Sequence, residues 1–261
     1  MRDSKIITFA HYKGGTGKTT SCINIAGALA KEGHKVLVID LDPQGNATSG
    51  LGINNQKLET HMLHIMDRKE LMTSIILKTN FENLHIAPTN HNLSMANIKT
   101  YDGKSEALIL TNAIKEIKEY YDFILIDTPP SHGHFIINGL IAADEIVMVL
   151  DVGVFSLESL SIFNESFFDF FKKLDLNLNI SMALVTKSND TSLPWKRNYG
   201  KEIQADVERY LNKPVFTLPY SEDIFISQAA GKPLSHHNPK SKIAKKYKEI
   251  AKKLSVEITA L

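Results

Sequence analysis

The segment from Lys13 to Thr20 has the residue types and the spacing that bind a nucleoside triphosphate. A triphosphate concentrates several negative charges in a small volume, so it needs many N–H donors, and glycines let backbone amides approach it closely. Lys18 can place a positive charge on the β- and γ-phosphate oxygens, and Thr19 can offer its hydroxyl to Mg²⁺. We therefore predict a phosphate-binding loop made of Lys13, Gly14, Gly15, Thr16, Gly17, Lys18, Thr19 and Thr20.

The chain on either side of this loop favours a strand–loop–helix unit. Lys5–Ala10 is a short apolar run suited to a buried strand, and residues 19–31 have the pattern of a helix whose N-terminal dipole adds to the anion site. The usual pattern G-x-x-x-x-G-K-[ST] would place glycine at position 12, where this chain has Tyr12. The loop is therefore a variant, and it carries an additional lysine, Lys13.

Aspartates close two further apolar runs. Residues 36–40 end at Asp40 and lead on to Asp42, and residues 123–127 repeat the pattern and end at Asp127. A carboxylate at the end of a buried strand is costly without a partner, and a magnesium ion or its water shell is such a partner. Because ligands bind beyond the carboxyl ends of strands in open α/β sheets, we expect the three carboxylates to converge with the loop. Taken singly, each could instead cap a helix or form a turn.

Together these motifs resemble the ParA/MinD group of deviant P-loop ATPases. The resemblance runs nearly end to end, and three shorter stretches are closer to the ParA branch than to MinD. The shared motifs are residues 13–20, 40–46 and 127–130, and the ParA-like stretches are residues 142–145, 231–233 and 238–241. The resemblance implies a sandwich dimer with two ATP molecules between the subunits.

The resemblance also implies roles for single residues. Lys13 of each subunit would reach the phosphates bound by the other subunit, and Asp42 would orient the attacking water. Asp40 and Asp127 would hold the magnesium through waters, with Thr19 as a direct ligand. The adenine contacts would be Asn189, Pro219 and Tyr220. A lysine supplied by a second subunit can neutralise phosphate charge only after dimerisation, so ATP would control assembly. A solvated Lys13 without this role is the alternative.

The spacing of apolar runs predicts the fold class. Helical stretches separate most of the runs, which favours an α/β fold with a doubly wound, mostly parallel sheet of about seven or eight strands flanked by helices. The runs are residues 6–10, 36–40, 84–87, 123–127, 146–150, 182–185 and 215–218. No repeat or break in composition divides the chain, so we expect one domain over residues 1–261. Residues 54–83 show no clear strand and are expected to form a helical insertion.

Cysteine content and hydropathy indicate where the protein works. The single cysteine, Cys22, cannot form an intramolecular disulfide, which suits a reducing cytoplasm. The chain starts without an apolar signal segment, and no run approaches the roughly 20 residues that span a bilayer. We therefore expect a soluble cytoplasmic protein.

Histidines do not predict a metal site. The pairs His132 with His134 and His236 with His237 come with neither the cysteines nor the H-x-x-x-H spacing of a zinc site. We expect His132 and His134 to lie in a loop after Asp127 that responds to nucleotide.

The C-terminal region suggests a second binding surface. A basic amphipathic helix is predicted at about residues 240–255, where apolar residues recur at helical spacing and seven lysines face one acid, Glu249. The lysines are Lys240, Lys242, Lys245, Lys246, Lys248, Lys252 and Lys253. Such a helix could simply pack by its apolar stripe, or bind the phosphates of DNA without base readout. Membrane anchoring is the weakest alternative, because the stripe lacks Phe, Trp and clustered Leu.

One stretch departs from the ParA pattern. Many ParA proteins have arginines just after the proline of the adenine loop, whereas Glu222 and Asp223 stand here and would repel a phosphate backbone. Positive charge for DNA would then come from the terminal helix or from Lys187, Lys196, Arg197 and Lys201. The formal net charge of +1 means that only a local patch could bind DNA.

The combined prediction is a magnesium-dependent ATPase of ParA type. ATP would drive dimerisation, the dimer would hold nucleoid DNA without sequence preference, and a ParB-like partner would stimulate hydrolysis during plasmid or chromosome partition. The alternatives are a ParA-like protein that positions non-DNA cargo, a MinD-like membrane-cycling ATPase and a nucleotide-gated binding module without hydrolysis. Metabolic relatives form a further alternative. An iron–sulfur reductase needs cluster cysteines that this chain lacks, and the ParA-like C-terminal half argues against a dethiobiotin-type ligase.

Overall fold

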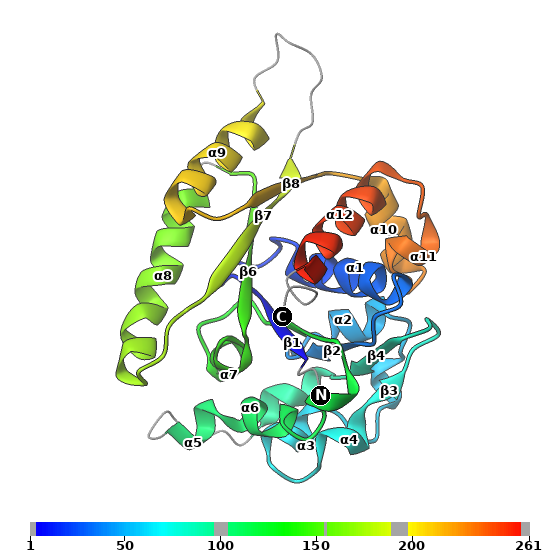
Figure 1. The fold of residues 1–261 in the computed structure, drawn as a ribbon. Coiled ribbons are helices and arrows are strands. Elements are labelled where there is room, and N and C mark those ends of the chain that lie inside the picture. Colours follow the sequence, from blue (N-terminus) through cyan, green and yellow to red (C-terminus); the bar gives the residue numbers. More distant parts are fainter. Residues whose placement is uncertain (1–3, 97–103, 154–155, 189–197, 257–261) are drawn as a thin grey trace.

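An eight-stranded sheet runs through the molecule in the order β3-β4-β2-β5-β1-β6-β7-β8 (Figure 1). The computed structural model describes residues 4–96, 104–153, 156–188 and 198–256. Its strands are β1 (Lys5–Ala10), β2 (Val36–Asp40), β3 (Leu77–Lys78), β4 (Leu84–Ala87), β5 (Phe123–Asp127), β6 (Glu145–Asp151), β7 (Ile180–Ser188) and β8 (Val215–Pro219). All neighbouring strands are parallel except β3 and β4. This confirms the predicted mostly parallel α/β sheet.

Helices connect the strands and cover both faces of the sheet. In the described part of the chain they are α1 (Lys18–Lys31), α2 (Asn46–Gly50), α3 (Met62–Met66), α4 (Met72–Ile75), α5 (Lys104–Ala107), α6 (Ile109–Ile114), α7 (His134–Ala142), α8 (Ser156–Lys173), α9 (Tyr199–Leu211), α10 (Glu222–Ala229), α11 (Leu234–His237) and α12 (Lys242–Val256). Short 3₁₀ turns are η1 (Asn55–Lys57), η2 (His91–Met95) and η3 (Lys118–Tyr120). No helix among these described segments is long and apolar enough to cross a membrane.

Side chains along each strand point alternately to the two faces of the sheet, so the hydrophobic core has a part on each face. On β5, Phe123 and Leu125 pack with the buried residues of α1 and α12, whereas Ile124 and Ile126 pack with those of α3, α4 and α6. Further along the second face, α7, α8 and α9 cover β6 and β7. Because successive strand side chains point to opposite faces, apolar runs without alternation are what a doubly covered parallel sheet requires.

Helix α12, at the position of the predicted basic helix, lies against α1 (Figure 1). Its apolar stripe includes Tyr247, Ile250 and Leu254, each at most 2% exposed and part of the same core cluster as α1. The chain before α12 also approaches α1 closely, since a Cβ at Gly27 would lie 2.4 Å from the Pro233 side chain. This helical glycine is therefore explained by the contact that it permits.

The segment expected to be a helical insertion is only partly helical. Residues 54–83 contain η1, α3 and α4, as expected, but they also contain β3, which pairs antiparallel with β4 at the edge of the sheet. The prediction that this segment lacks a strand was therefore wrong for Leu77 and Lys78. Both residues of β3 are exposed, so the strand gives no buried apolar run for sequence analysis to find.

Candidate functional site

The predicted phosphate-binding loop connects β1 to α1 at the carboxyl end of the central strands. Gly15 and Gly17 have φ values of 74° and 92°, in the left-handed region that favours glycine. Helix α1 begins at Lys18, one residue before the predicted start. The loop thus brings its glycine backbone and the N-terminus of a long helix to one place, which is the arrangement that binds phosphate groups.

Lys18 lies inside the site and is held by the loop itself. Its Nζ donates a hydrogen bond to the carbonyl oxygen of Lys13 at 3.1 Å, and the residue is only 5% exposed. Burial lowers the pKa of this ammonium, while the nearby carboxylates of Asp127 and Asp42 act in the opposite direction. The Lys18 ammonium is therefore near the carboxylates of Asp127 and Asp42, which can bind a cation next to it.

The second lysine of the loop is paired within the same chain. Lys13 Nζ lies 3.1 Å from Asp151 Oδ1 and 3.2 Å from Oδ2, and Asp151 is the last residue of β6. The Lys13 side chain is still 48% exposed. An ion pair this open to water contributes little to stability, so Lys13 can leave Asp151 at small cost.

Asp40 and Asp127 stand side by side, because they are partners in the register of β2 with β5. Asp40 Oδ2 accepts hydrogen bonds from the Thr48 hydroxyl at 2.7 Å and from the Thr48 backbone N–H at 2.8 Å. Burial is the main cause that raises the pKa of Asp40 to about 7, and the Thr48 hydrogen bonds oppose it. Asp40 is thus a satisfied carboxylate behind the site.

Asp127 differs from Asp40 in having no satisfied oxygen. Both of its carboxylate oxygens are buried, and neither has a hydrogen-bond partner of ordinary geometry among the described residues. Burial, followed by the neighbouring Asp40 charge, raises the pKa of Asp127 well above its usual value, and Thr19 and Lys18 act in the opposite direction. A buried carboxylate without partners is a group that a cation would satisfy.

These residues fit Mg²⁺ rather than a metal held by protein ligands alone. The part of the chain that the structure describes has no group of three or more His, Cys, Asp or Glu residues that could hold a metal ion. Mg²⁺ keeps several waters and typically binds through one or two carboxylates together with substrate phosphates. Thr19 and Asp127 have oxygens of this kind, and Asp40, whose oxygens already accept hydrogen bonds from Asp42 and Thr48, would act through water.

Asp42 lies on the cavity side of the same strand end. It is 7% exposed and lines the cavity, and its Oδ1 accepts a hydrogen bond from the Gln44 N–H at 3.0 Å. One oxygen therefore stabilises the turn after β2. This position fits a carboxylate that orients a water molecule within the cavity.

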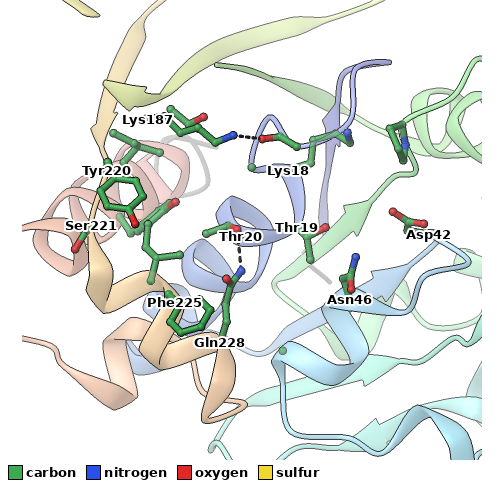
Figure 2. Close-up of a pocket in the computed structure, with 18 of the residues that line it drawn as sticks. Lys18, Thr19, Thr20, Asp42, Asn46, Lys187, Tyr220, Ser221, Phe225 and Gln228 are labelled. Carbon is green, nitrogen blue, oxygen red and sulfur yellow. Dashed lines mark hydrogen bonds between the residues drawn. The ribbon is translucent and has the colours of Figure 1, made fainter. Parts of the chain in front are cut away.

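A cavity of about 730 Å³ is lined by Lys18, Thr19 and Asp42 among others. Figure 2 shows Lys18, Thr19 and Asp42 at one end and Tyr220, Ser221 and Phe225 at the other. Pro219 and Tyr220, predicted to contact adenine, line this second end, while Asn189 lies outside the described residues. The size and the charged end suit a nucleotide.

Sequence analysis missed several residues of the site. Phe225 and Gln228 of α10 line the cavity, and Gln228 Nε2 donates to the Thr20 hydroxyl at 2.9 Å. Asp151, the partner of Lys13, was missed as well. Lys187, suggested above as a charge for DNA, lines the cavity instead and donates to the carbonyl oxygen of Gly15 (Figure 2). None of these residues belongs to a motif that its own neighbours in sequence could have revealed.

The loop after Asp127 is fixed by aromatic contacts. His132 stacks on Tyr12 at a ring-centroid distance of 5.0 Å and on Phe167 of α8 at 5.6 Å. His134 is the first residue of α7, so the expectation that both histidines lie in the loop was wrong for His134. Tyr12, which replaces the first glycine of the usual motif, therefore packs beside the phosphate loop against the segment that follows Asp127.

The raised pKa of Asp40 predicts a pH dependence of stability. Between its usual value of 3.8 and about 7, the folded chain holds a proton that the unfolded chain has lost. The contribution of Asp40 to the free energy of unfolding therefore falls as pH rises through this window, by up to about 1.4 kcal/mol per pH unit, and changes no further above it. Denaturant unfolding without nucleotide or Mg²⁺, at about pH 5 and about pH 8, measures this slope.

The matched variant for this experiment is Asp40→Asn, which cannot titrate. We expect its stability to change less between the two pH values than that of the unchanged protein, with the remaining slope coming from Asp127 and other acids. An equal slope in both proteins would contradict the assignment.

The lysines of α12 form an exposed face. Lys242, Lys245, Lys248, Lys252 and Lys253 are exposed and Lys246 is partly buried, while the apolar stripe faces α1. Lys248 makes an ion pair with Glu32 at 2.7 Å, so part of this charge is balanced. The surface still has an excess of positive charge.

The acidic residues after β8 have a local structural role. Asp223, in the first turn of α10, accepts hydrogen bonds from Asn238 Nδ2 at 3.0 Å and from the Ser221 hydroxyl at 3.3 Å. Glu222 stands in the same first turn, where acidic residues favour the helix dipole. These residues therefore make the region beside the cavity mouth acidic.

Comparison with known proteins agrees with the geometry. Residues 4–183 match the AAA domain family. The sporulation initiation inhibitor protein Soj of Bacillus subtilis is 34% identical over 253 residues, which cover 96% of this chain and 98% of Soj. The chromosome-partitioning ATPase Soj of Treponema pallidum is 32% identical over 252 residues, 96% of each chain. The McdA–ATP complex of Cyanothece has a TM-score of 0.86 at 22% identity over 98% of both chains, a likeness of fold.

Proposed function

Because this chain belongs to the ParA family of P-loop ATPases, we propose that it is an ATP-driven switch that positions DNA. The observation that carries the proposal is the cavity lined by Lys18, Thr19 and Asp42, with the unsatisfied carboxylate of Asp127 buried near Lys18. Such a cavity offers donors for a triphosphate, oxygens for Mg²⁺ and a carboxylate for water. These are the groups that phosphoryl transfer requires.

In the proposed reaction each side chain has a separate task. The glycine backbone and Lys18 would bind the β- and γ-phosphates, and Thr19 would hold the magnesium, with Asp40 and Asp127 holding it through waters. A magnesium ion held there would supply positive charge for the phosphate oxygens. Asp42 orients a water molecule for attack on the γ-phosphate. Pro219 and Tyr220 lie at the adenine end, where Asn189 is a further proposed contact.

Lys13 would couple ATP binding to dimerisation. In one chain its ammonium is paired with Asp151 and half exposed, and the pair is weak enough to open. We infer that Lys13 leaves Asp151 and reaches the phosphates of a second subunit when two ATP-bound chains meet. A cation supplied in this way stabilises the transition state only in the dimer.

The exposed lysines of α12 are the proposed DNA surface. Contacts from lysines to phosphates give affinity without sequence preference and make binding depend steeply on salt. The relatives named as chromosome-partitioning proteins support DNA as the cargo. In this scheme the dimer works in the cytoplasm on nucleoid DNA, and a ParB-like partner stimulates hydrolysis to release it.

The test is binding of the purified protein to arbitrary duplex DNA with Mg-ATP, with Mg-ADP and without nucleotide. We expect binding only when Mg-ATP is present. The affinity for DNA should fall at least about tenfold as the salt concentration rises from about 50 to about 200 mM. Lys13→Ala should abolish it, because this variant cannot complete the dimer. Binding that does not depend on nucleotide would contradict the switch.

A matched pair of triple variants locates the surface. Changing Lys245, Lys252 and Lys253 to Gln should weaken DNA binding, whereas changing the exposed Lys57, Lys78 and Lys115 to Gln removes the same charge away from α12 and should have little effect. Equal losses in the two triples would show that only net charge matters.

A second candidate is a ParA-like protein that positions non-DNA cargo. The acidic first turn of α10, with Glu222 and Asp223, favours it, because this turn stands where many ParA proteins carry arginines. A dimer that forms with ATP but binds neither DNA nor anionic liposomes would support this candidate over both the DNA-binding and the MinD-like alternatives.

A further inference from the structure

Lys187 has an unusual backbone at the carboxyl end of β7. Its φ of 57° lies in the left-handed region, which is uncommon for a residue other than glycine. The pairing of β7 with β8 shifts register between Thr186 and Ser188, so Lys187 stands in an irregularity of the strand. Irregularities of this kind redirect a side chain. Here the redirected side chain lines the nucleotide cavity.

The redirected ammonium contacts the phosphate loop. Lys187 Nζ donates to the carbonyl oxygen of Gly15 at 2.7 Å, as Figure 2 shows from the cavity side. The preceding residue makes a parallel contact, since the Thr186 hydroxyl donates to the carbonyl oxygen of Thr16 at 2.7 Å. Consecutive residues of β7 therefore hold consecutive carbonyl groups of the loop.

Holding a carbonyl group also orients an amide. In a planar trans peptide the C=O of one residue and the N–H of the next point in opposite directions. Contacts on the carbonyl oxygens of Gly15 and Thr16 therefore turn the N–H groups of Thr16 and Gly17 away from β7. Among the described residues neither N–H donates to a protein acceptor, so both remain available to phosphate oxygens.

The Lys187 contact also places a charge at the tip of the loop. Among the described residues its ammonium has no carboxylate partner, in contrast to Lys13, which is paired with Asp151. A hydrogen bond from a charged donor is stronger than one from a neutral hydroxyl. Lys187 is thus the stronger of the two contacts from β7.

We propose that Lys187 is a positioning residue for the phosphate loop, which it holds in the nucleotide-binding conformation through the Gly15 carbonyl group. This inference rests on the proposed nucleotide binding at the same site. The contact is made to the loop and not to a reacting atom, so it serves ADP and ATP alike. Removal of such an interaction weakens binding uniformly and leaves the chemical step unchanged.

The test compares three substitutions of Lys187 in the full chain. Lys187→Met removes the donor, Lys187→Asn removes it with a residue that tolerates a left-handed backbone, and Lys187→Arg keeps a charged donor. We expect Met and Asn to raise the Kd of fluorescent ADP and ATP analogues by similar factors, about three- to tenfold, with kcat changed less than about twofold. The Kd of the Lys187→Arg variant should be closer to that of the unchanged protein. The control variant Lys115→Met, which changes a lysine outside the cavity, should have the same Kd as the unchanged protein.

Thermal melting of each variant separates positioning from folding. An Asn variant that melts like the unchanged protein but binds nucleotide more weakly supports the proposal. Unchanged affinity in both Met and Asn variants would overturn it, as would a fall in kcat at unchanged Kd. Loss of DNA binding by the Met variant at saturating ATP would instead assign Lys187 to a DNA surface.

The outcome for the unchanged protein keeps the two proposals apart. If it binds no nucleotide, the proposed function fails. If it binds nucleotide and the Lys187 variants bind equally well, only the positioning role fails.

Discussion

Lys18→Ala is expected to lower the affinity for ATP and for ADP by at least about 100-fold, the largest effect of any single substitution in this chain. The Lys18 ammonium is nearly buried and interacts electrostatically with Asp127 and Asp42. Without it, Lys187 at the tip of the loop is the remaining lysine among the residues that line the cavity, and the charge of Asp42 is no longer offset by Lys18. Titration with fluorescent ADP and ATP analogues measures the loss.

The control for Lys18 is Lys115→Ala at the end of α6. Lys115 is exposed, donates a hydrogen bond to Asn112 one turn earlier and does not line the cavity, so its removal takes away the same charge outside the site. We expect this variant to bind nucleotide normally. Normal affinity in the Lys18 variant would refute the phosphate-binding loop itself, and with it the proposed function.

Asp42→Ala is expected to lower ATP turnover by about 100-fold or more while ATP affinity changes only a few-fold. Asp42 lines the cavity just after β2, where it can orient the attacking water. Its hydrogen bond is to the Gln44 N–H, and not to the phosphate loop or to the residues of the adenine end. If hydrolysis separates the subunits, the variant should also accumulate as an ATP-bound dimer. Steady-state turnover and light scattering after size exclusion measure both effects.

Asp42→Asn separates chemistry from structure at this position. The amide oxygen of Asn can still accept the hydrogen bond from the Gln44 N–H, so the turn after β2 should persist. A carboxamide cannot attract a proton from water as a carboxylate does, so turnover should fall as in the Ala variant. Turnover close to that of the unchanged protein in both variants would exclude Asp42 from the reaction.

Local sequence was sufficient to predict the sheet and the phosphate loop. Most predicted strands are runs of apolar residues that parallel packing buries on both faces, so the period and the composition agree. In the edge strand β8, Val215 and Leu218 are buried and the other residues are partly buried. The phosphate loop and the carboxylates at the ends of β2 and β5 could be predicted together, because a triphosphate with Mg²⁺ requires both. Strand β3 could not be found, because two exposed residues at a sheet edge leave no apolar signal.

Contacts between distant segments explain what the sequence did not reveal. Lys187 is 172 residues away from Gly15 in the chain, and its orientation depends on a register shift between β7 and β8. The pair of Lys13 with Asp151 joins the ends of β1 and β6, which only the strand order makes neighbours. Such contacts depend on tertiary geometry rather than on local propensity.

Helix α12 places two independent requirements on one short segment. Its buried stripe belongs to the main core, so deleting the helix would remove Tyr247, Ile250 and Leu254 and expose the apolar surface of α1 that they cover. Its lysines point into solvent, where substitutions cost little stability. During evolution the charge of this surface can therefore drift while the ATPase core stays intact. Proteins with this architecture can therefore acquire a different cargo through surface substitutions on α12, while the residues of the ATP site stay unchanged.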